Sequence, residues 1–155
     1  MTDAGTVVRL LVERGQTVAT AESLTAGLVT ATLTTVPGSS AVVRGGLVVY
    51  ATDLKATLAG VPADLLARHG AVHPDVAAAL AEGARLRCGA DWGVGLTGVA
   101  GPDPQDGVAP GRVYLSIAGP DGGTGYRLDL CGDREAVRAA SVAAAIDALH
   151  TALTG

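Results

Sequence analysis

The chain has 155 residues, of which 48% are hydrophobic and 17% are charged, and its net charge is −4. This length and hydropathy suit one folded domain, so we expect a single domain over residues 1–155. The acidic balance argues against a broad surface for nucleic-acid phosphates, and we expect no direct nucleic-acid binding. Aromatic residues make up only 3% of the chain, which argues against a base-stacking surface.

Cysteine usage and the N-terminus indicate a compartment. Cys88 and Cys131 are far apart in the sequence and form no Cys-x-x-Cys pair, which favours a reducing environment over a disulfide framework. The sequence shows no signal-peptide pattern and no apolar run of membrane-spanning length. We therefore expect a soluble cytoplasmic protein without a membrane partner.

The first half of the chain alternates helical and strand patterns. Helix signals include Gly15 as a stop, Asp53 as a cap and Pro62 as a start. The predicted elements are a helix at 7–13, a strand at 17–21, a helix at 24–35, a strand at 46–50, a short helix after Asp53, a helix at 62–69 and an alanine-rich helix at 74–88.

The second half adds strands that pair locally. A strand at 92–97 leads into a loop at 98–111 that is rich in glycine and proline. Strands at 112–118 and 126–130 form a predicted hairpin, and Asp133 caps a long helix that ends near Leu153. Strands interleaved with helices predict an α/β fold with three layers, α/β/α, around a mixed sheet of about five strands.

Lys55 is the only lysine in the chain, beside ten arginines. Burial can lower the pKa of a lysine until it is a neutral base, whereas a guanidinium stays charged. Together with Ser23 and Tyr50, this lysine could form a nucleophile with its base. The alternative is that a bias toward arginine left one surface lysine by chance.

Ser23 lies at a predicted junction between a strand and a helix. A helix N-terminus presents free amide groups, which can bind an anion or stabilise an oxyanion. The alternative is that Ser23 is only a helix cap. Ser39 and Ser40 follow Pro37-Gly38, and this pattern is typical of a turn as well as of a hydroxyl-lined site.

Two glycine patterns need interpretation. Gly93-x-Gly95-x-x-Gly98 matches the letters of a dinucleotide fingerprint, but it runs through a strand into a loop where the fingerprint requires a turn and a helix. We interpret it as unrelated to nucleotide binding. The segment from Thr97 to Pro102 follows a strand, where it is either a ligand-binding loop or a plain turn.

Two further clusters carry weaker signals. His69 and His73 are separated by Gly70, so we expect no shared helical face and no metal site. Arg134 and Arg138 lie on one face of the first turns of the last helix, where the helix dipole disfavours cations. This placement suggests an anionic partner, although surface ion pairs would also explain it.

Several segments taken together resemble one family. They are TAESLTAG (20–27), PGSS (37–40), RGGLVVY with LK shortly after it (44–55), GVPADLLARHGAV (60–72), LTGVAGPD (96–103), GRVYL (111–115) and GDREAVR (132–138). Their order and content are similar to the carboxy-terminal domain of the CinA family, the competence- and damage-inducible proteins. The stand-alone form of that domain resembles nicotinamide mononucleotide deamidase.

The resemblance implies an amidohydrolase that converts nicotinamide mononucleotide and water to nicotinate mononucleotide and ammonia in the recycling of NAD. It implies Ser23 as nucleophile, Lys55 as base, Tyr50 as a proton relay or orienting hydroxyl, and Arg134 as a substrate contact. It implies no cofactor and no metal. The remaining residues that we expect at the substrate are Glu22, Thr25, Gly27, Ser39, Ser40, Thr97, Gly98, Ala100 and Gly101.

The sequence departs from the family pattern at several places. Ala26 stands where the family commonly has glycine, and Thr52 stands where it commonly has asparagine. An alternative reading is a catalytically silent domain that binds a nucleotide or a protein partner in competence or DNA repair. We expect a homodimer or a higher homo-oligomer, because much alanine-rich helix surface needs covering.

Overall fold

The structure is a computed structural model that describes residues 2–155, so residue 1 of the predicted domain lies outside the described residues. A five-stranded sheet has the strand order β2-β1-β3-β4-β5. Strand β1 runs parallel to β2 and β3, whereas β4 is antiparallel to both of its neighbours. The elements in chain order are α1 (Ala4–Arg14), β1 (Val18–Glu22), α2 (Leu28–Thr34), a short 3-10 helix (Ser39–Ala41), β2 (Val43–Val48), α3 (Thr52–Thr57), α4 (Ala63–His69), α5 (Pro74–Arg87), β3 (Trp92–Gly98), β4 (Arg112–Gly119), β5 (Gly122–Asp129) and α6 (Arg134–Thr154).

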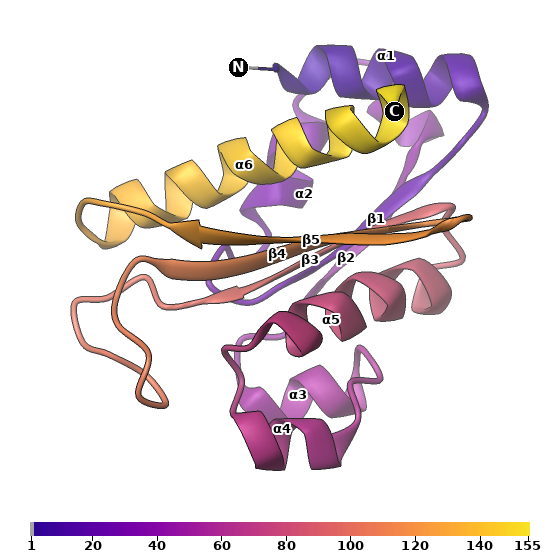
Figure 1. Cartoon of the computed structure of the whole chain (residues 1–155). Helices are drawn as coiled ribbons and strands as arrows, with labels where there is room; N and C mark the ends of the chain where they lie inside the picture. Colours follow the sequence, from indigo (N-terminus) through magenta and orange to yellow (C-terminus); the bar gives the residue numbers. More distant parts are fainter. Residues whose placement is uncertain (1) are drawn as a thin grey trace.

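Helices cover both faces of the sheet. Helices α1, α2 and α6 lie on one face, and α5 lies on the other with α3 and α4 beyond it (Figure 1). Each face has its own cluster of buried aliphatic side chains, built mainly from alanine, valine and leucine. The predicted three-layer α/β/α fold with a mixed, five-stranded sheet is therefore confirmed.

The glycines of strand β3 serve packing. A Cβ atom at Gly93 would collide with the backbone of Ala81, and one at Gly95 would collide with the backbone of Ala77 and Ala81. The absence of side chains thus lets α5 lie directly on the sheet. Strand β3 leads into a loop and then β4 rather than into a tight turn and a helix, so the Gly-x-Gly-x-x-Gly letters are not a dinucleotide fingerprint.

Helix α6 begins at the predicted cap, where the Asp133 side chain accepts a hydrogen bond from the amide of Ala136. Its length and composition would by themselves also suit a membrane-spanning helix. In the fold, however, α6 contacts α1, α2 and β4, and Val137, Ile146 and Leu149 are buried in the core. It is the long core helix of the upper layer (Figure 1).

The predicted starts of α2 and α3 are wrong. Helix α2 begins at Leu28 rather than at residue 24, because residues 24–27 form a turn in which Ala26 and Gly27 have left-handed φ angles of 49° and 96°. Asp53 lies inside the first turn of α3, whose N-cap is Ala51. Ser23 therefore lies in the turn that precedes a helix and not at the helix N-terminus itself.

The buried carboxylate of Glu22 explains the late start of α2. Glu22 is fully buried at the end of β1, and its two oxygens accept hydrogen bonds from the amides of Val29 (2.9 Å) and Thr30 (3.0 Å). Its other donors are the hydroxyls of Thr20, Thr25 and Thr30. The first amides of any helix have no partner within the helix and need acceptors from elsewhere. In α2 a side chain of the preceding strand provides these acceptors, and its negative charge suits the helix N-terminus.

We expect Glu22→Gln to lower the free energy of unfolding by about 2 to 4 kcal/mol, because an amide presents one acceptor oxygen and turns its own N–H groups toward buried donors. Urea denaturation would measure this difference. Glu13→Gln, at an exposed position of α1, removes the same charge and should change stability by less than about 0.5 kcal/mol. Equal stability of the two variants would contradict this role of Glu22.

Candidate functional site

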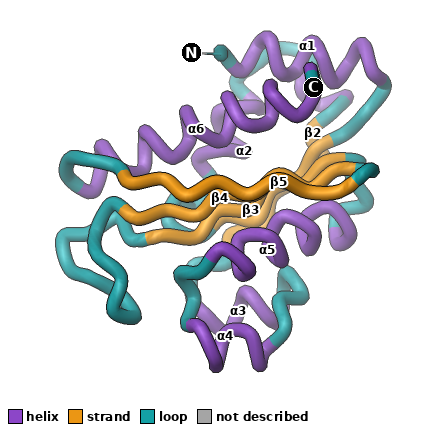
Figure 2. Tube along the Cα trace, in the orientation of Figure 1, coloured by secondary structure: helices purple, strands orange, loops and turns teal. Residues whose placement is uncertain are grey.

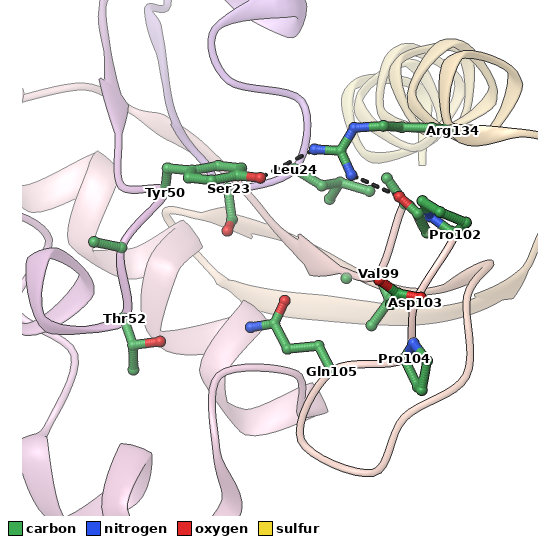
Figure 3. A pocket seen from close by; sticks show the side chains of 14 residues that line it. Ser23, Leu24, Tyr50, Thr52, Val99, Pro102, Asp103, Pro104, Gln105 and Arg134 are labelled. Carbon is green, nitrogen blue, oxygen red and sulfur yellow. Dashed lines mark hydrogen bonds between the residues drawn. The ribbon is translucent and has the colours of Figure 1, made fainter.

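A cavity of about 470 Å³ lies where the three parallel strands end. Ser23 follows β1, Tyr50 lies just beyond β2, and Gly98 closes β3, so three adjacent strands deliver residues to the same edge of the sheet. Open α/β sheets bind ligands at this edge, and the volume suits a small molecule. The loop between β3 and β4, a long teal segment in Figure 2, encloses the other side of the cavity (Figure 3).

Ser23 is held by backbone pairing at the wall of this cavity. Its amide donates to the carbonyl of Leu96 on β3 (3.2 Å), and the residue is only 8% exposed. Within residues 2–155 its hydroxyl makes no hydrogen bond, and the side chain lines the cavity. The fixed backbone leaves the Ser23 hydroxyl open to a ligand in the cavity, and a base within reach would be needed to activate it.

Arg134 bridges two walls of the cavity. Its guanidinium donates to the carbonyl of Gly101 (2.7 Å) and to the phenol oxygen of Tyr50 (3.0 Å) (Figure 3). Since a guanidinium carries five N–H donors, three remain beyond these two bonds. The first residue of α6 thus brings a positive charge to the cavity and orients the exposed Tyr50 ring.

Lys55 is 1% exposed and is among the largest fully buried side chains in the described chain. Its amine donates to the carbonyls of Val49 (2.8 Å) and Tyr50 (3.2 Å), which belong to the segment that carries the Tyr50 ring into the cavity. The amide of Val49 in turn donates to the carbonyl of Glu22, next to Ser23. The chance surface lysine considered above is therefore excluded.

Burial lowers the pKa of Lys55 from 10.5 to about 8, while the carboxylate of Asp106 acts in the opposite direction. Burial is therefore the cause of the lowered pKa, as considered above for this lysine. At pH 8 about half of the lysine side chains would be neutral, which makes this amine a usable base near physiological pH.

Several residues that the sequence assigned to the substrate do not line the cavity. Glu22 and Thr25 belong to the buried network that caps α2. The Thr97 hydroxyl donates to the carbonyl of Ala71 (2.6 Å), and Gly27 provides the turn into α2. Ser39 and Ser40 lie in the 3-10 helix that precedes β2, at the opposite ends of the parallel strands.

The cavity gathers six of the expected residues and adds some that sequence reasoning missed, whereas Lys55 is not among its lining residues. Ser23, Tyr50, Gly98, Ala100, Gly101 and Arg134 all line it. The additional lining residues are Leu24, Ala51, Thr52, Val99, Pro102, Asp103, Pro104 and Gln105. The Asp106-Gly107 pair is a hairpin signal that could have revealed how the loop folds back with Gln105.

The two histidines lie closer together than the sequence indicated. The rings of His69 and His73 stack with centroids 4.0 Å apart, and Asp75 brings a carboxylate oxygen within 4.8 Å of both. As expected, the two residues share no helical face, since His69 ends α4 and His73 caps α5, but the turn at Gly70 still brings their rings together. His73 Nδ1 accepts a hydrogen bond from the Asp75 amide and thereby caps α5.

Because the chain has a single lysine, its titration can be followed without overlap. We expect the Cε resonance of ¹³C-lysine-labelled protein to titrate with a midpoint near pH 8. Asp106→Asn should lower the midpoint because it removes the charge that stabilises the ammonium, whereas Asp53→Asn should leave it unchanged. A midpoint near 10.5 in the unmodified protein would refute the buried neutral base.

Solved structures share this fold over nearly the whole chain. A CinA superfamily protein from Klebsiella pneumoniae superposes with a TM-score of 0.94 at 32% identity, covering 97% of this chain and 95% of that one. The competence/damage inducible protein CihA from Agrobacterium tumefaciens gives a TM-score of 0.90 at 33% identity, covering 100% and 98%. Both are therefore proteins of similar extent.

Curated relatives are longer. A CinA-like protein from Frankia casuarinae is 48% identical over 151 residues, which are 97% of this chain and 35% of the relative. One from Anaeromyxobacter sp. strain K is 49% identical over 148 residues, 95% of this chain and 36% of the relative. The chain thus spans about a third of their length. The family model of the CinA C-terminal domain matches residues 2–153, and the chain belongs to this family.

Proposed function

We propose that this domain is an amidohydrolase that uses Ser23 as its nucleophile and Lys55 as its base, and that its substrate is nicotinamide mononucleotide. The observation that carries the proposal is a free serine hydroxyl in a cavity, together with a buried lysine of lowered pKa whose amine hydrogen-bonds to the backbone carbonyl of Tyr50, a cavity residue. The names of the relatives state the family and no reaction, so the chemistry rests on the site.

The hydrogen bonds of Lys55 suit a neutral amine. An ammonium has three N–H donors, whereas a neutral amine has two donors and one lone pair. Two carbonyls, those of Val49 and Tyr50, accept from the amine. A neutral Lys55 would satisfy both carbonyls and keep its lone pair to accept a proton, which is what a general base needs.

The proposed reaction has two halves. Lys55 takes the proton of the Ser23 hydroxyl, and the oxygen attacks the carboxamide carbon. Lys55 returns the proton to the departing nitrogen, so ammonia leaves and an ester to Ser23 remains. Water then attacks this ester as Lys55 takes its proton, and the acid departs when the proton returns to Ser23.

The oxyanion of each tetrahedral intermediate requires donors. The first amides of α2 are unavailable because Glu22 occupies those of Val29 and Thr30. The proposed donors are instead backbone amides along the cavity wall, at Leu24 and in the loop of Ala100 and Gly101. This assignment replaces the helix N-terminus that the sequence suggested.

The substrate also carries a phosphate, for which Arg134 is the proposed partner. Its guanidinium has donors beyond those used by Tyr50 and Gly101, and guanidinium groups bind phosphate oxygens in pairs. The cavity volume of about 470 Å³ is in the range that holds a mononucleotide.

We expect purified protein to release ammonia from nicotinamide mononucleotide in the presence of EDTA, and Ser23→Ala to lower this rate by about a thousandfold or more. Lys55→Arg should do the same because a guanidinium cannot act as the base. Lys55→Met serves as a second variant if arginine does not fit the buried position. Ammonia assays with thermal melts on each variant would measure both effects.

The controls separate the alternatives. Thr151→Ala removes an exposed hydroxyl of α6 and should leave the rate unchanged. Unchanged release by Ser23→Ala would mean direct attack by water. Binding of the nucleotide without any release by the unmodified protein would favour the catalytically silent domain instead.

Arg134→Ala should raise KM about tenfold or more with a smaller change in kcat, because it removes the proposed phosphate partner. Arg127→Ala removes an equal charge from an exposed position on β5 and should have little effect. Steady-state kinetics on the two variants measure this difference. A loss confined to kcat would assign Arg134 to the transition state.

A further inference from the structure

We propose that Gln105 is a specificity-determining residue that binds the carboxamide of the substrate and discriminates against the carboxylate of the product. This inference rests on the proposed amidohydrolase function and adds a residue and a selection to it. Its basis is the position, the support and the free hydrogen-bonding capacity of the Gln105 side chain.

Gln105 enters the cavity from the wall opposite β1. Its amide points from the loop between β3 and β4 toward the hydroxyls of Ser23 and Thr52, whereas Arg134 lies beside Tyr50 at the other end of the view (Figure 3). A substrate whose phosphate lies at Arg134 and whose reacting carbon lies at Ser23 would therefore present its carboxamide near Gln105.

The loop that carries Gln105 is braced by backbone pairing. Gln105 and Val108 exchange two backbone hydrogen bonds of 3.0 and 2.8 Å. The two residues between them, Asp106 and Gly107, have φ angles of 52° and 76°, the left-handed pair of a two-residue hairpin turn. Such a turn fixes the direction in which the Gln105 side chain leaves the backbone.

A second contact anchors this turn to the rest of the fold. The carboxylate of Asp106 accepts a hydrogen bond from the amide of Ala71 (3.2 Å). The carbonyl of Ala71 in turn accepts a hydrogen bond from the hydroxyl of Thr97 at the end of β3 (2.6 Å). The turn is thereby tied to the strand whose loop it closes, so Gln105 is presented from a supported segment.

The Gln105 side chain is free to bind a ligand. The chain has two glutamines and no asparagine, and Gln16 is engaged by Trp92 and Arg14. Within residues 2–155 the Gln105 amide makes no hydrogen bond, and it is the single side-chain amide that lines the cavity.

An amide group both donates and accepts, as does a primary carboxamide, so the two can form a reciprocal pair of hydrogen bonds. A carboxylate only accepts, so one of its oxygens would face the oxygen of Gln105. Sites that bind a donor on the substrate discriminate against analogues that lack it, because their own polar group is left unpaired. Gln105 would thus favour the amide that enters over the acid that leaves.

The test measures dissociation constants of nicotinamide mononucleotide and nicotinate mononucleotide by calorimetry, with Ser23→Ala protein so that no turnover occurs. We expect the amide to bind about tenfold more tightly than the acid. Adding Gln105→Met to the Ser23→Ala protein keeps a side chain of similar length that forms no hydrogen bonds. The ratio of the two dissociation constants should then be close to one. In Gln105→Glu the carboxylate only accepts hydrogen bonds and repels the carboxylate of the acid. This variant should therefore weaken binding of nicotinate mononucleotide further and raise the preference for the amide.

The outcomes separate this inference from the proposed function. The same ratio of dissociation constants in the Ser23→Ala protein and in its Gln105→Met and Gln105→Glu derivatives would overturn the role of Gln105. It would leave the nucleotide site intact. Failure of the Ser23→Ala protein to bind either nucleotide would overturn the proposed function and this inference with it. Gln105 is exposed, so thermal melts should show that all three proteins fold equally well.

Discussion

A buried negative charge without a cation partner constrains the whole site. The carboxylate of Glu22 lies in the interior at the end of the central strand, where an unpaired charge would be strongly destabilising. Hydroxyl and amide donors from β1, the following turn and α2 stabilise it instead. This arrangement fixes where β1 ends and where α2 begins, and Ser23 lies between the two.

That constraint determines which groups can bring positive charge to the cavity. In many α/β proteins the helix after the first strand binds an anion with its free amides. Here an internal carboxylate occupies those amides, so positive charge must reach the cavity by another route. Arg134 supplies it from the first residue of α6, where the helix dipole opposes a cation. The carbonyl of Gly101 and the phenol of Tyr50 hold it there.

The sequence predicted the layers, the mixed sheet and the cap of α6, because hydrophobic periodicity, proline, glycine and Asp133 act over short distances. It misplaced the start of α2, because the capping group, Glu22, lies on the preceding strand, and no local rule connects them. It did not reveal Thr52, Asp103 or Gln105 as cavity residues, because loop residues reach a cavity through the path of the chain in space. The buried environment of Lys55 was likewise a tertiary property, and only its uniqueness showed in the sequence.

Asp106 acts on both the turn that presents Gln105 and the protonation of Lys55. Its carboxylate anchors the turn that presents Gln105, and its charge also favours the protonated form of Lys55. Moving this carboxylate away from Lys55 would lower the pKa of the amine further, since burial would then act unopposed. The proton affinity of Lys55 therefore depends on the carboxylate that anchors the turn of Gln105.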